Sequence, residues 1–321
     1  MILPAERAMR VAVTGASGFI GRRLVVELAS RGHQVRVLTR RTPQASWWEG
    51  VAPQIVRGDL TDTAALERLV ADAEVVINLA GLIKATNRQH FMAVNRDGAQ
   101  TLASVLTPLP AVRLVHISSL AARQPQLSDY AASKRAGEQV VMQGLGPRVL
   151  VLRPPAVYGP GDRETLVFFK LAARRWAPLL SADTHARAAL IHVADLCSLI
   201  RCLVEHEPAP RAQAWEVADD CPQGYSWRQI MQAAARAVGN ADLHLFALPH
   251  AALRSMATCG DVARLLGNAN LLTTQKLREL CFPDWSVPVA SRLIPTAWPA
   301  RFDLDGGFAD AVRGYRATGM L

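Results

Sequence analysis

The sequence predicts an α/β protein with a doubly wound parallel sheet and a smaller, mostly helical lobe towards its C-terminus. Over the first 155 residues, short apolar runs alternate with amphipathic stretches, which is typical of a parallel sheet covered by helices on both faces. The apolar runs are continuous, as expected of strands that are buried on both faces. Beyond residue 162 this alternation stops, and the chain becomes rich in proline and mostly helical in pattern.

Six strands are expected in the first part of the chain. In order they are RVAVT (10–14), QVRVL (34–38), PQIV (53–56), VVINL (75–79), VRLVHI (112–117) and RVLVL (148–152). The amphipathic stretch GFIGRRLVVELASRG (18–32) should form a helix that ends at Gly32, because glycine readily adopts the conformation that stops a helix.

The later part of the chain should return to the sheet once. LIHV and ADLCSLIRCLVEH, residues 190–206, have the pattern of one further strand–helix pair. Helical patterns follow at 226–238, 272–281 and 306–318. We therefore expect a first domain of residues 1–155, joined by 190–206, and a second lobe formed by 156–189 and 207–321.

Composition limits the classes of partner. The net charge is +9, but the arginines are scattered and form no basic stripe with interleaved aromatic residues, so no nucleic-acid partner is expected. No apolar run reaches the roughly 18 residues of a membrane span. Glu6 and Arg7 interrupt the start of the chain where a secretion signal needs apolar residues, which favours a cytoplasmic protein. The cysteines form no CxxC pair and the histidines no ligand spacing, so no metal is expected.

Three glycines lie between the first strand and the first helix. In VTGASGFIG (13–21), Gly15, Gly18 and Gly21 let the backbone turn tightly and let a pyrophosphate approach closely. The N-terminus of the following helix offers free N–H groups and a positive dipole to such an anion. The first domain is therefore expected to bind a dinucleotide, and the second lobe a small-molecule substrate.

The residues after the second strand indicate which dinucleotide is bound. An acidic residue there would accept hydrogen bonds from the ribose 2′-hydroxyl and favour NAD(H). The sequence has Thr39, Arg40 and Arg41 instead. Because a guanidinium pairs well with a 2′-phosphate, NADP(H) is favoured and NAD(H) stays an open alternative.

Tyr130 and Lys134 lie four residues apart in SDYAASKRAGE (128–138), which places them one turn apart on the same face of a helix. This helix follows the fifth strand, which ends in Ser118 and Ser119 at the edge where parallel sheets bind ligands. A nearby ammonium lowers the pKa of a phenol and makes it a competent general acid or base. Tyr130 is expected to transfer a proton, Lys134 to supply charge and Ser119 to hold the substrate oxygen.

Together these segments resemble the extended branch of the short-chain dehydrogenase/reductase superfamily, the epimerase/dehydratase-like family. The glycine loop and YAASK (130–134) occur in the family's order with GDL (58–60), NLAG (78–81), the VN ending at Asn95, RPPAVYGPGD (153–162) and IHVADL (191–196). The resemblance runs nearly end to end. It implies a Rossmann fold and an NAD(P)-dependent oxidoreductase, in which a hydride moves between the nicotinamide and a secondary alcohol or ketone.

The resemblance also implies contacts to the cofactor. Asp59 and Leu60 would hold the adenine, and Pro155 and Val157 would flank the nicotinamide. Lys134 would bind the nicotinamide ribose. The full expected set is Gly15, Ser17, Gly18, Phe19, Ile20, Gly21, Arg40, Asp59, Leu60, Leu79, Ala80, Gly81, Asn95, Tyr130, Lys134, Pro155 and Val157. For Asn95, a purely structural role in its helix is an equal alternative.

The substrate is expected to be fairly apolar. Only ten residues separate Ser119 from Tyr130, which is short for this branch, where sugar-nucleotide epimerases usually carry a longer insertion. A steroid-like, polyketide-like or aromatic molecule would suit the short segment. Its pocket would be lined by Ile83, Lys84, Phe168 and Phe169, with Trp176 as a further lid residue, although Phe168 and Trp176 could instead pack the small lobe.

Two other functions remain open at this point. An NAD-dependent nucleotide-sugar epimerase or dehydratase would keep its dinucleotide bound and recycle it. A non-catalytic regulatory or assembly protein would bind the dinucleotide without chemistry, but such relatives often lose the Tyr or Lys that this chain keeps. A homodimer could form through helices at 89–107 and 130–144, as in many members of the family.

Overall fold

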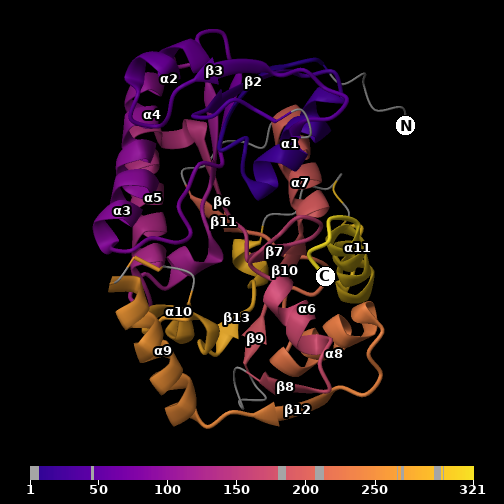
Figure 1. Ribbon diagram of the computed structural model, residues 1–321. Helices are drawn as coiled ribbons and strands as arrows, with labels where there is room; N and C mark the ends of the chain where they lie inside the picture. The colour runs from indigo at the N-terminus through magenta and orange to yellow at the C-terminus, as the bar shows by residue number, and fades with distance from the viewer. Residues whose placement is uncertain are drawn as a thin grey trace.

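The computed structural model describes residues 7–44, 47–179, 186–206, 213–265, 267–268, 271–292, 298 and 300–321. Its centre is a seven-stranded parallel sheet in the order β11-β6-β5-β4-β1-β2-β3 (Figure 1). The strands are β1 (Arg10–Thr14), β2 (Gln34–Thr39), β3 (Gln54–Arg57), β4 (Val75–Asn78), β5 (Arg113–Ile117), β6 (Val149–Arg153) and β11 (Ala214–Glu216). The strand order reverses between β1 and β4, and open α/β sheets bind ligands at such a point.

Helices cover both faces of this sheet. On one face lie α1 (Phe19–Ala29) and α7 (Val193–Glu205), and on the other lie α2 (Thr63–Val70), α4 (Gly98–Leu106) and α5 (Asp129–Leu145). Successive residues of β1 show why continuous apolar strands are needed. Val11 and Val13 pack under α1 and α7, whereas Ala12 packs on the opposite face. The predicted doubly wound parallel sheet is confirmed.

All six predicted strands are present within about one residue of their expected ends. β11 was not expected, and it pairs with β6 at the edge of the sheet. β3 also departs from the expectation of strands buried on both faces, because it is the opposite edge strand and is largely exposed. The segment 190–206 returns to the sheet in part. Its helix, α7, packs beside α1, but β10 (Leu190–His192) pairs with β7 (Ala156–Tyr158) outside the main sheet.

The C-terminal lobe is mostly helical, as expected, and has its own core around Phe169, Phe308 and Tyr315. Its helices are α6 (Leu166–Ala172), α8 (Trp227–Val238), α9 (His250–Leu265), α10 (Thr274–Leu280) and α11 (Leu304–Ala317). Two small parallel ribbons complete it, β8 (Trp176–Leu179) with β12 (His244–Ala247) and β9 (Arg187–Ala188) with β13 (Asp284–Trp285). None of the described helices is long and apolar enough to cross a membrane.

Between β4 and α4 the chain forms α3 (Arg88–Met92) and then one turn of π-helix, Ala93–Asp97. Short 3-10 helices occur at Leu120–Arg123, Gly146–Arg148 and Val289–Ser291. A π-helical turn within an α-helix is often found at a functional site. Here the π-turn carries Asn95 and the first 3-10 helix directly follows Ser119, so both irregular turns adjoin the predicted site.

Candidate active site

The glycine loop after β1 packs directly on the end of β4. Gly15 has a φ of +70°, and a Cβ there would lie 2.6 Å from the backbone nitrogen of Ala80. A Cβ on Gly21 would lie 2.2 Å from the carbonyl oxygen of Gly15. Both positions therefore require glycine. Gly15 needs it for its positive φ and for the close approach of the β4 end, and Gly21 needs it only for the close approach of the loop backbone. The loop residues thus form a tight backbone cradle at the switch point of the sheet.

The cradle opens onto the N-terminus of α1. The N-cap is Gly18, which has no side chain to satisfy the first N–H groups of the helix, carried by Phe19 and Ile20. The backbone carbonyl of Ser17 accepts a hydrogen bond of 2.8 Å from Arg22 Nε, which brings a guanidinium beside the loop. An uncapped helix N-terminus, a cradle with no room for side chains and an adjacent cation fit a pyrophosphate. These residues therefore suit the predicted dinucleotide.

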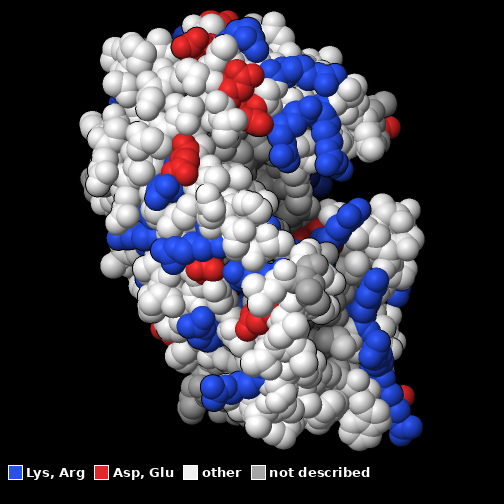
Figure 2. Space-filling view, turned by 60° about the vertical axis from the view of Figure 1, so that its left-hand side comes forward, with Lys and Arg blue, Asp and Glu red and all other residues white. Residues whose placement is uncertain are grey.

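Basic side chains gather where the adenine ribose would lie. Arg40 and Arg41 are exposed after β2, and Arg57 at the end of β3 donates to Thr42 Oγ1 at 2.8 Å. Figure 2 shows a hollow between the sheet domain and the C-terminal lobe, with Lys and Arg side chains along its upper rim. Arg40 also attracts the Asp59 carboxylate. The charge at this end of the hollow therefore suits an anionic ligand.

Asp59 and Leu60 differ in how far they can face that ligand. Thr61 donates to Asp59 Oδ1 from its backbone nitrogen at 2.8 Å and from its hydroxyl at 2.6 Å, and these bonds lower the pKa of the Asp59 carboxyl. Asp59 is half-buried, and its carboxylate also interacts with the backbone of Asp62. The side chain of Leu60 is buried against Gly98 of α4, where an added Cβ would lie 2.7 Å away. Only the backbone of Leu60 is therefore placed to contact an adenine.

The structure separates the two serines that the sequence placed side by side. Ser118 is buried and donates its hydroxyl to Glu138 Oε1 at 2.6 Å. Ser119 caps the following 3-10 helix, where its Oγ accepts a bond of 3.2 Å from the backbone nitrogen of Ala121, and it also hydrogen-bonds with Tyr130. Ser119 is therefore the serine that faces the candidate catalytic phenol, whereas Ser118 is bonded to Glu138 inside the protein.

Tyr130 and Lys134 lie in the first turns of α5. Ser128 caps this helix by accepting a hydrogen bond of 2.9 Å from the backbone nitrogen of Ala131. The Tyr130 ring lies 6.1 Å from that of Phe91, centre to centre. One turn further on, the buried Lys134 donates from Nζ to the carbonyl oxygen of Ile117 at 2.8 Å. The ammonium is thus anchored at the end of β5, beneath the serine and the phenol.

The electrostatics of this group differ in one respect from the expectation. Burial raises the pKa of the Tyr130 phenol to about 12, and the hydrogen bond with Ser119 opposes this rise. Burial also lowers the pKa of Lys134 to about 8, against the attraction of Glu138. The expected lowering of the phenol pKa by Lys134 is therefore not found, because desolvation and the charge of Glu279 raise this pKa. A protonated Tyr130 is suited to donate a proton, which is the role that ketone reduction requires.

Asn95 connects the loop after β4 to the catalytic helix. Its Oδ1 accepts from the Leu82 backbone nitrogen at 2.7 Å, and its Nδ2 donates to the Leu82 carbonyl at 3.0 Å and to Ser133 Oγ at 2.8 Å. Since both amide hydrogens are used by the protein, Asn95 positions the site. A Cβ on Gly81 would lie 3.3 Å from Asn95 Oδ1 and 3.4 Å from Lys134 Nζ, so this loop passes close to the ammonium.

Sequence reasoning missed a buried ion-pair network beneath the site. Arg153 forms a bidentate pair with Glu138, with bonds of 2.7 Å from Nε to Oε1 and 2.6 Å from Nη2 to Oε2. Both residues are buried, and Arg153 also approaches Glu216 at 3.7 Å. Glu138 stands four residues after Lys134 on α5, so helical spacing could have placed it on the same face. The network ties the end of β6 to α5.

A second buried polar chain crosses the sheet near the switch point, and it was also missed. Thr14 Oγ1 donates to Asn78 Oδ1 at 2.5 Å, and Asn78 Nδ2 donates to His116 Nδ1 at 3.0 Å. Burial, together with the charge of Lys134, lowers the pKa of His116 to about 3. This histidine is therefore neutral and structural. A polar residue within the apolar run LVHI (114–117), His116, was the signal that could have revealed it.

The remaining cofactor residues lie around the same end of the sheet. Leu79 and Val157 pack against the core cluster that also contacts Phe19 and Ile20, and Pro155 follows directly after β6. The structure thus brings the expected cofactor residues to one edge. No cluster of metal-ligating side chains occurs in the described part of the chain.

The four expected substrate residues do not all face the hollow. Ile83 is exposed, and Lys84 pairs with Glu164 at 2.9 Å, joining the loop after β4 to the loop before α6. Phe168 is half-buried, with its ring 5.7 Å from that of Trp227. Phe169 needs a correction, because its ring is fully buried against Phe308 and Tyr315. It packs the interior of the lobe.

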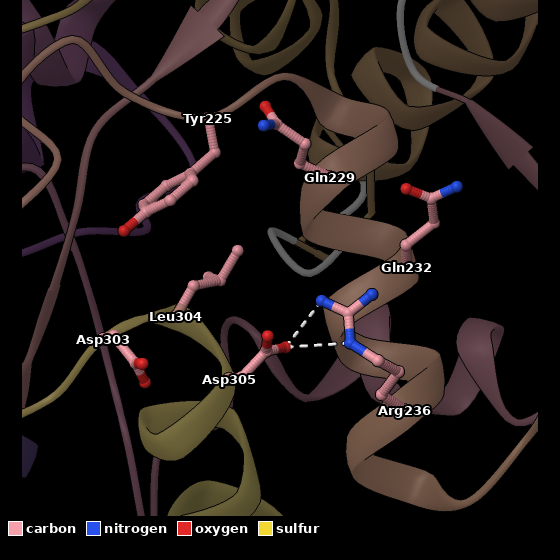
Figure 3. A pocket seen from close by; sticks show the side chains of 7 residues that line it. All are labelled: Tyr225, Gln229, Gln232, Arg236, Asp303, Leu304 and Asp305. Atoms are coloured by element: carbon pink, nitrogen blue, oxygen red, sulfur yellow. Dashed lines mark hydrogen bonds and ion pairs between the residues drawn. The ribbon is translucent and has the colours of Figure 1, made fainter.

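A separate hollow of about 410 Å³ lies within the C-terminal lobe, between α8 and the start of α11 (Figure 3). Its lining is mainly polar, and Arg236 spans it by pairing with Asp305 at 2.6 Å. The lining residues are Tyr225, Gln229, Gln232, Arg236, Asp303, Leu304 and Asp305. None of them belongs to the group around Tyr130, so this hollow is distinct from the candidate active site.

The chain belongs to the NAD-dependent epimerase/dehydratase family of the extended short-chain dehydrogenase/reductase superfamily. The family model, described as "NAD dependent epimerase/dehydratase family", matches residues 11–218. A ceramide reductase of Caulobacter vibrioides is 43% identical over 316 residues, which cover 97% of this chain and 96% of the relative. A relative from Stigmatella aurantiaca is a ketoreductase named for a farnesyl-bearing dihydroquinoline oxide. It is 28% identical, and the match covers 67% of this chain and 69% of the relative. The family and the site together define an NAD(P)-dependent oxidoreductase.

Solved structures show the same fold. The Bordetella bronchiseptica enzyme WbmG, in complex with NAD and UDP, has a TM-score of 0.72 over 98% of this chain and 97% of its own, at 17% identity. At this identity the likeness concerns the fold alone. It confirms the predicted Rossmann architecture with its C-terminal lobe.

The pKa values lead to a pH prediction. Because Lys134 has a pKa of about 8 and Tyr130 one of about 12, Tyr130 keeps its proton while Lys134 loses its charge as the pH rises. We expect kcat/KM for ketone reduction to fall as the pH rises through about 8, since the Lys134 ammonium, which is expected to bind the ribose and to support proton transfer, loses its charge. A pH–rate profile measures this. A profile that stays flat through that range contradicts the assignment.

Proposed function

We propose that the chain is an NAD(P)H-dependent reductase whose substrate is the ketone form of a ceramide-type lipid. The observation that carries this proposal is the relationship to the Caulobacter ceramide reductase over nearly the full length of both chains. The group of Ser119, Tyr130 and Lys134 supports it, because Ser119 hydrogen-bonds with Tyr130 and Lys134 lies one helical turn further along α5. The apolar substrate expected from the short Ser119–Tyr130 segment agrees with a lipid.

The chemistry of a ceramide identifies the group that is reduced. A ceramide carries a secondary alcohol on its long-chain base, and the matching oxidised molecule is a ketone at that carbon. When bound, a reduced nicotinamide would supply the hydride to the carbonyl carbon and would itself be oxidised. Tyr130 donates its phenolic proton to the carbonyl oxygen, so that a C–H and an O–H bond form while the C=O double bond becomes single. Ser119 donates a hydrogen bond that orients the same oxygen, and Lys134 holds its charge beside the phenol.

NADP(H) is the favoured cofactor. The segment after β2 carries no carboxylate, and Arg40 is exposed there with its charge free for a 2′-phosphate. We expect NADPH to bind at least tenfold more tightly than NADH, a difference of about 1.4 kcal/mol. Arg40→Ala should remove this preference, because it should weaken the binding of NADPH and leave the binding of NADH unchanged.

Fluorescence titration of the reduced nicotinamide measures both affinities. Arg36→Ala is a suitable control, because Arg36 lies on β2 but bonds to Gln54 and Asp72 at the opposite end of the strand. An equal affinity for NADH and NADPH in the unchanged protein would contradict the NADP(H) proposal.

The function itself is tested by incubating the purified protein with NADPH and the keto-ceramide in detergent micelles. We expect nicotinamide oxidation and the ceramide alcohol in equal amounts. Nucleotide-sugar ketones serve as the comparison substrates. Turnover of these, with none of the lipid, would overturn the proposed substrate.

A nucleotide-sugar epimerase or dehydratase is the second candidate, favoured by the family whose model matches residues 11–218. The short segment between Ser119 and Tyr130 argues against it. Tightly bound NAD in the purified protein would support it. Dimerisation through 89–107 and 130–144 stays a prediction, which mass photometry tests.

A further inference from the structure

The parallel ribbon of β8 and β12 presents an apolar outer face. Along β8 the inner side chains Ala177 and Leu179 are buried in the lobe core, whereas Trp176 and Pro178 point the other way. In the strand register Trp176 stands beside His244, and Pro178 beside Phe246. Because side chains of a strand alternate between faces, these four share the outer face. Figure 1 shows the ribbon at the lower end of the molecule, opposite β2 and β3.

The aromatic side chains on this face are unusually exposed. Trp176 is 57% exposed and Phe246 is 41% exposed. The Trp176 ring stacks on His244 with a centre-to-centre distance of 4.7 Å and an interplanar angle of 30°, so the pair forms a flat aromatic surface. Large apolar side chains grouped on one surface mark an interaction site. Nothing in the described part of the chain covers them.

Basic side chains accompany this face. Lys170, Arg174 and Arg175 are exposed on the segment that leads from α6 into β8. Between residues 165 and 179 the sequence has no carboxylate, and Asp242 is the acidic residue beside β12. On the face drawn in Figure 2, basic side chains also outnumber acidic ones over the lower lobe. The ribbon therefore combines exposed tryptophan and phenylalanine with positive charge.

We propose that the β8–β12 ribbon docks onto the surface of an anionic lipid bilayer. Tryptophan and phenylalanine insert at the level of the headgroups, and arginine and lysine attract anionic lipids. The choice of occupant rests on the proposed function, because a ceramide-type substrate resides in membranes. A peripheral contact with the bilayer would give the protein access to such a substrate.

The ribbon is connected to the candidate active site by a short rigid element. Glu164, which pairs with Lys84 beside the hollow, lies two residues before α6, and Trp176 lies four residues after its end. A helix of seven residues is about 10 Å long. A bilayer that touches the ribbon is thus close to the lobe that closes over the substrate.

The test is sedimentation of the full chain with vesicles. Mixed phosphatidylcholine–phosphatidylglycerol vesicles are compared with phosphatidylcholine alone, at low and high salt. We expect binding to the anionic vesicles that weakens with salt. The double variant Trp176→Ser/Phe246→Ser should bind at least tenfold less. Arg174→Glu/Arg175→Glu should do the same on anionic vesicles. Ile55→Ser is the matched control, because Ile55 is 48% exposed on β3 at the other end of the molecule.

Each outcome has a distinct meaning. Failure of the unchanged protein to bind anionic vesicles, or unchanged binding by both double variants, overturns the inference. A change of oligomeric state in the Trp176/Phe246 variant, with vesicle binding intact, assigns the face to a second copy of the chain and also overturns it. Turnover of the keto-ceramide in detergent micelles is measured in parallel. If the unchanged protein does not turn over the keto-ceramide in micelles, this counts against the proposed function. The vesicle result is independent of that outcome.

Discussion

Replacing Tyr130 with phenylalanine is expected to lower the turnover number for ketone reduction by about 10²–10⁴-fold, the usual contribution of a general acid. The substitution removes only the phenolic oxygen. The ring keeps its contact with Phe91, and Lys134 keeps its bond to the Ile117 carbonyl. Cofactor affinity should therefore change little. Steady-state turnover and fluorescence titration of NADPH, measured on the same preparation, separate the two effects.

Tyr158→Phe is the matched control for this substitution. Tyr158 is fully buried, and its hydroxyl has no hydrogen-bond partner among the described residues. Removing that hydroxyl should leave turnover unchanged. If Tyr130→Phe and Tyr158→Phe retain similar turnover, Tyr130 is not the proton donor.

Replacing Glu138 with alanine is expected to lower the free energy of unfolding by about 3–5 kcal/mol. The carboxylate is fully buried and accepts two bonds from Arg153 and one from the Ser118 hydroxyl. Without it, the guanidinium of Arg153 stays buried and keeps only its more distant partner, Glu216 at 3.7 Å. The penalty therefore comes mainly from a desolvated charge that loses its counterion.

Urea denaturation followed by circular dichroism measures this loss. Glu67→Ala on α2 is the control, because Glu67 is exposed on its helix and should change stability by no more than about 0.5 kcal/mol. Equal stability of the two variants would show that the pair with Arg153 contributes nothing net to the fold.

The sheet was predictable because its signal is local and repeated. Each buried strand is a continuous apolar run, and the glycines of VTGASGFIG occur where the chain must turn. β11 escaped prediction because it is only three residues long and is defined by its pairing with β6. The position of β10 was also not predictable, since pairing with β7 in place of the main sheet depends on contacts distant in sequence.

The site was predictable where spacing fixes geometry and unpredictable where burial decides the chemistry. Tyr130 and Lys134 share a helix face as their spacing required. The pKa of Tyr130, however, is set by desolvation, which no local pattern reports. The same limit applies to Phe169, whose place in the lobe core depends on Phe308 and Tyr315 from the far end of the chain.

The central claim is that a hydride passes from a dissociable nicotinamide to a lipid ketone. The most direct measurement uses NADPH that carries deuterium at the transferable position of nicotinamide C4, with the keto-ceramide in micelles. Mass spectrometry of the product should show one deuterium on the new carbinol carbon, and one oxidised nicotinamide should form for each alcohol. Conversion of a substrate without net nicotinamide oxidation, or an alcohol free of deuterium, would contradict the account.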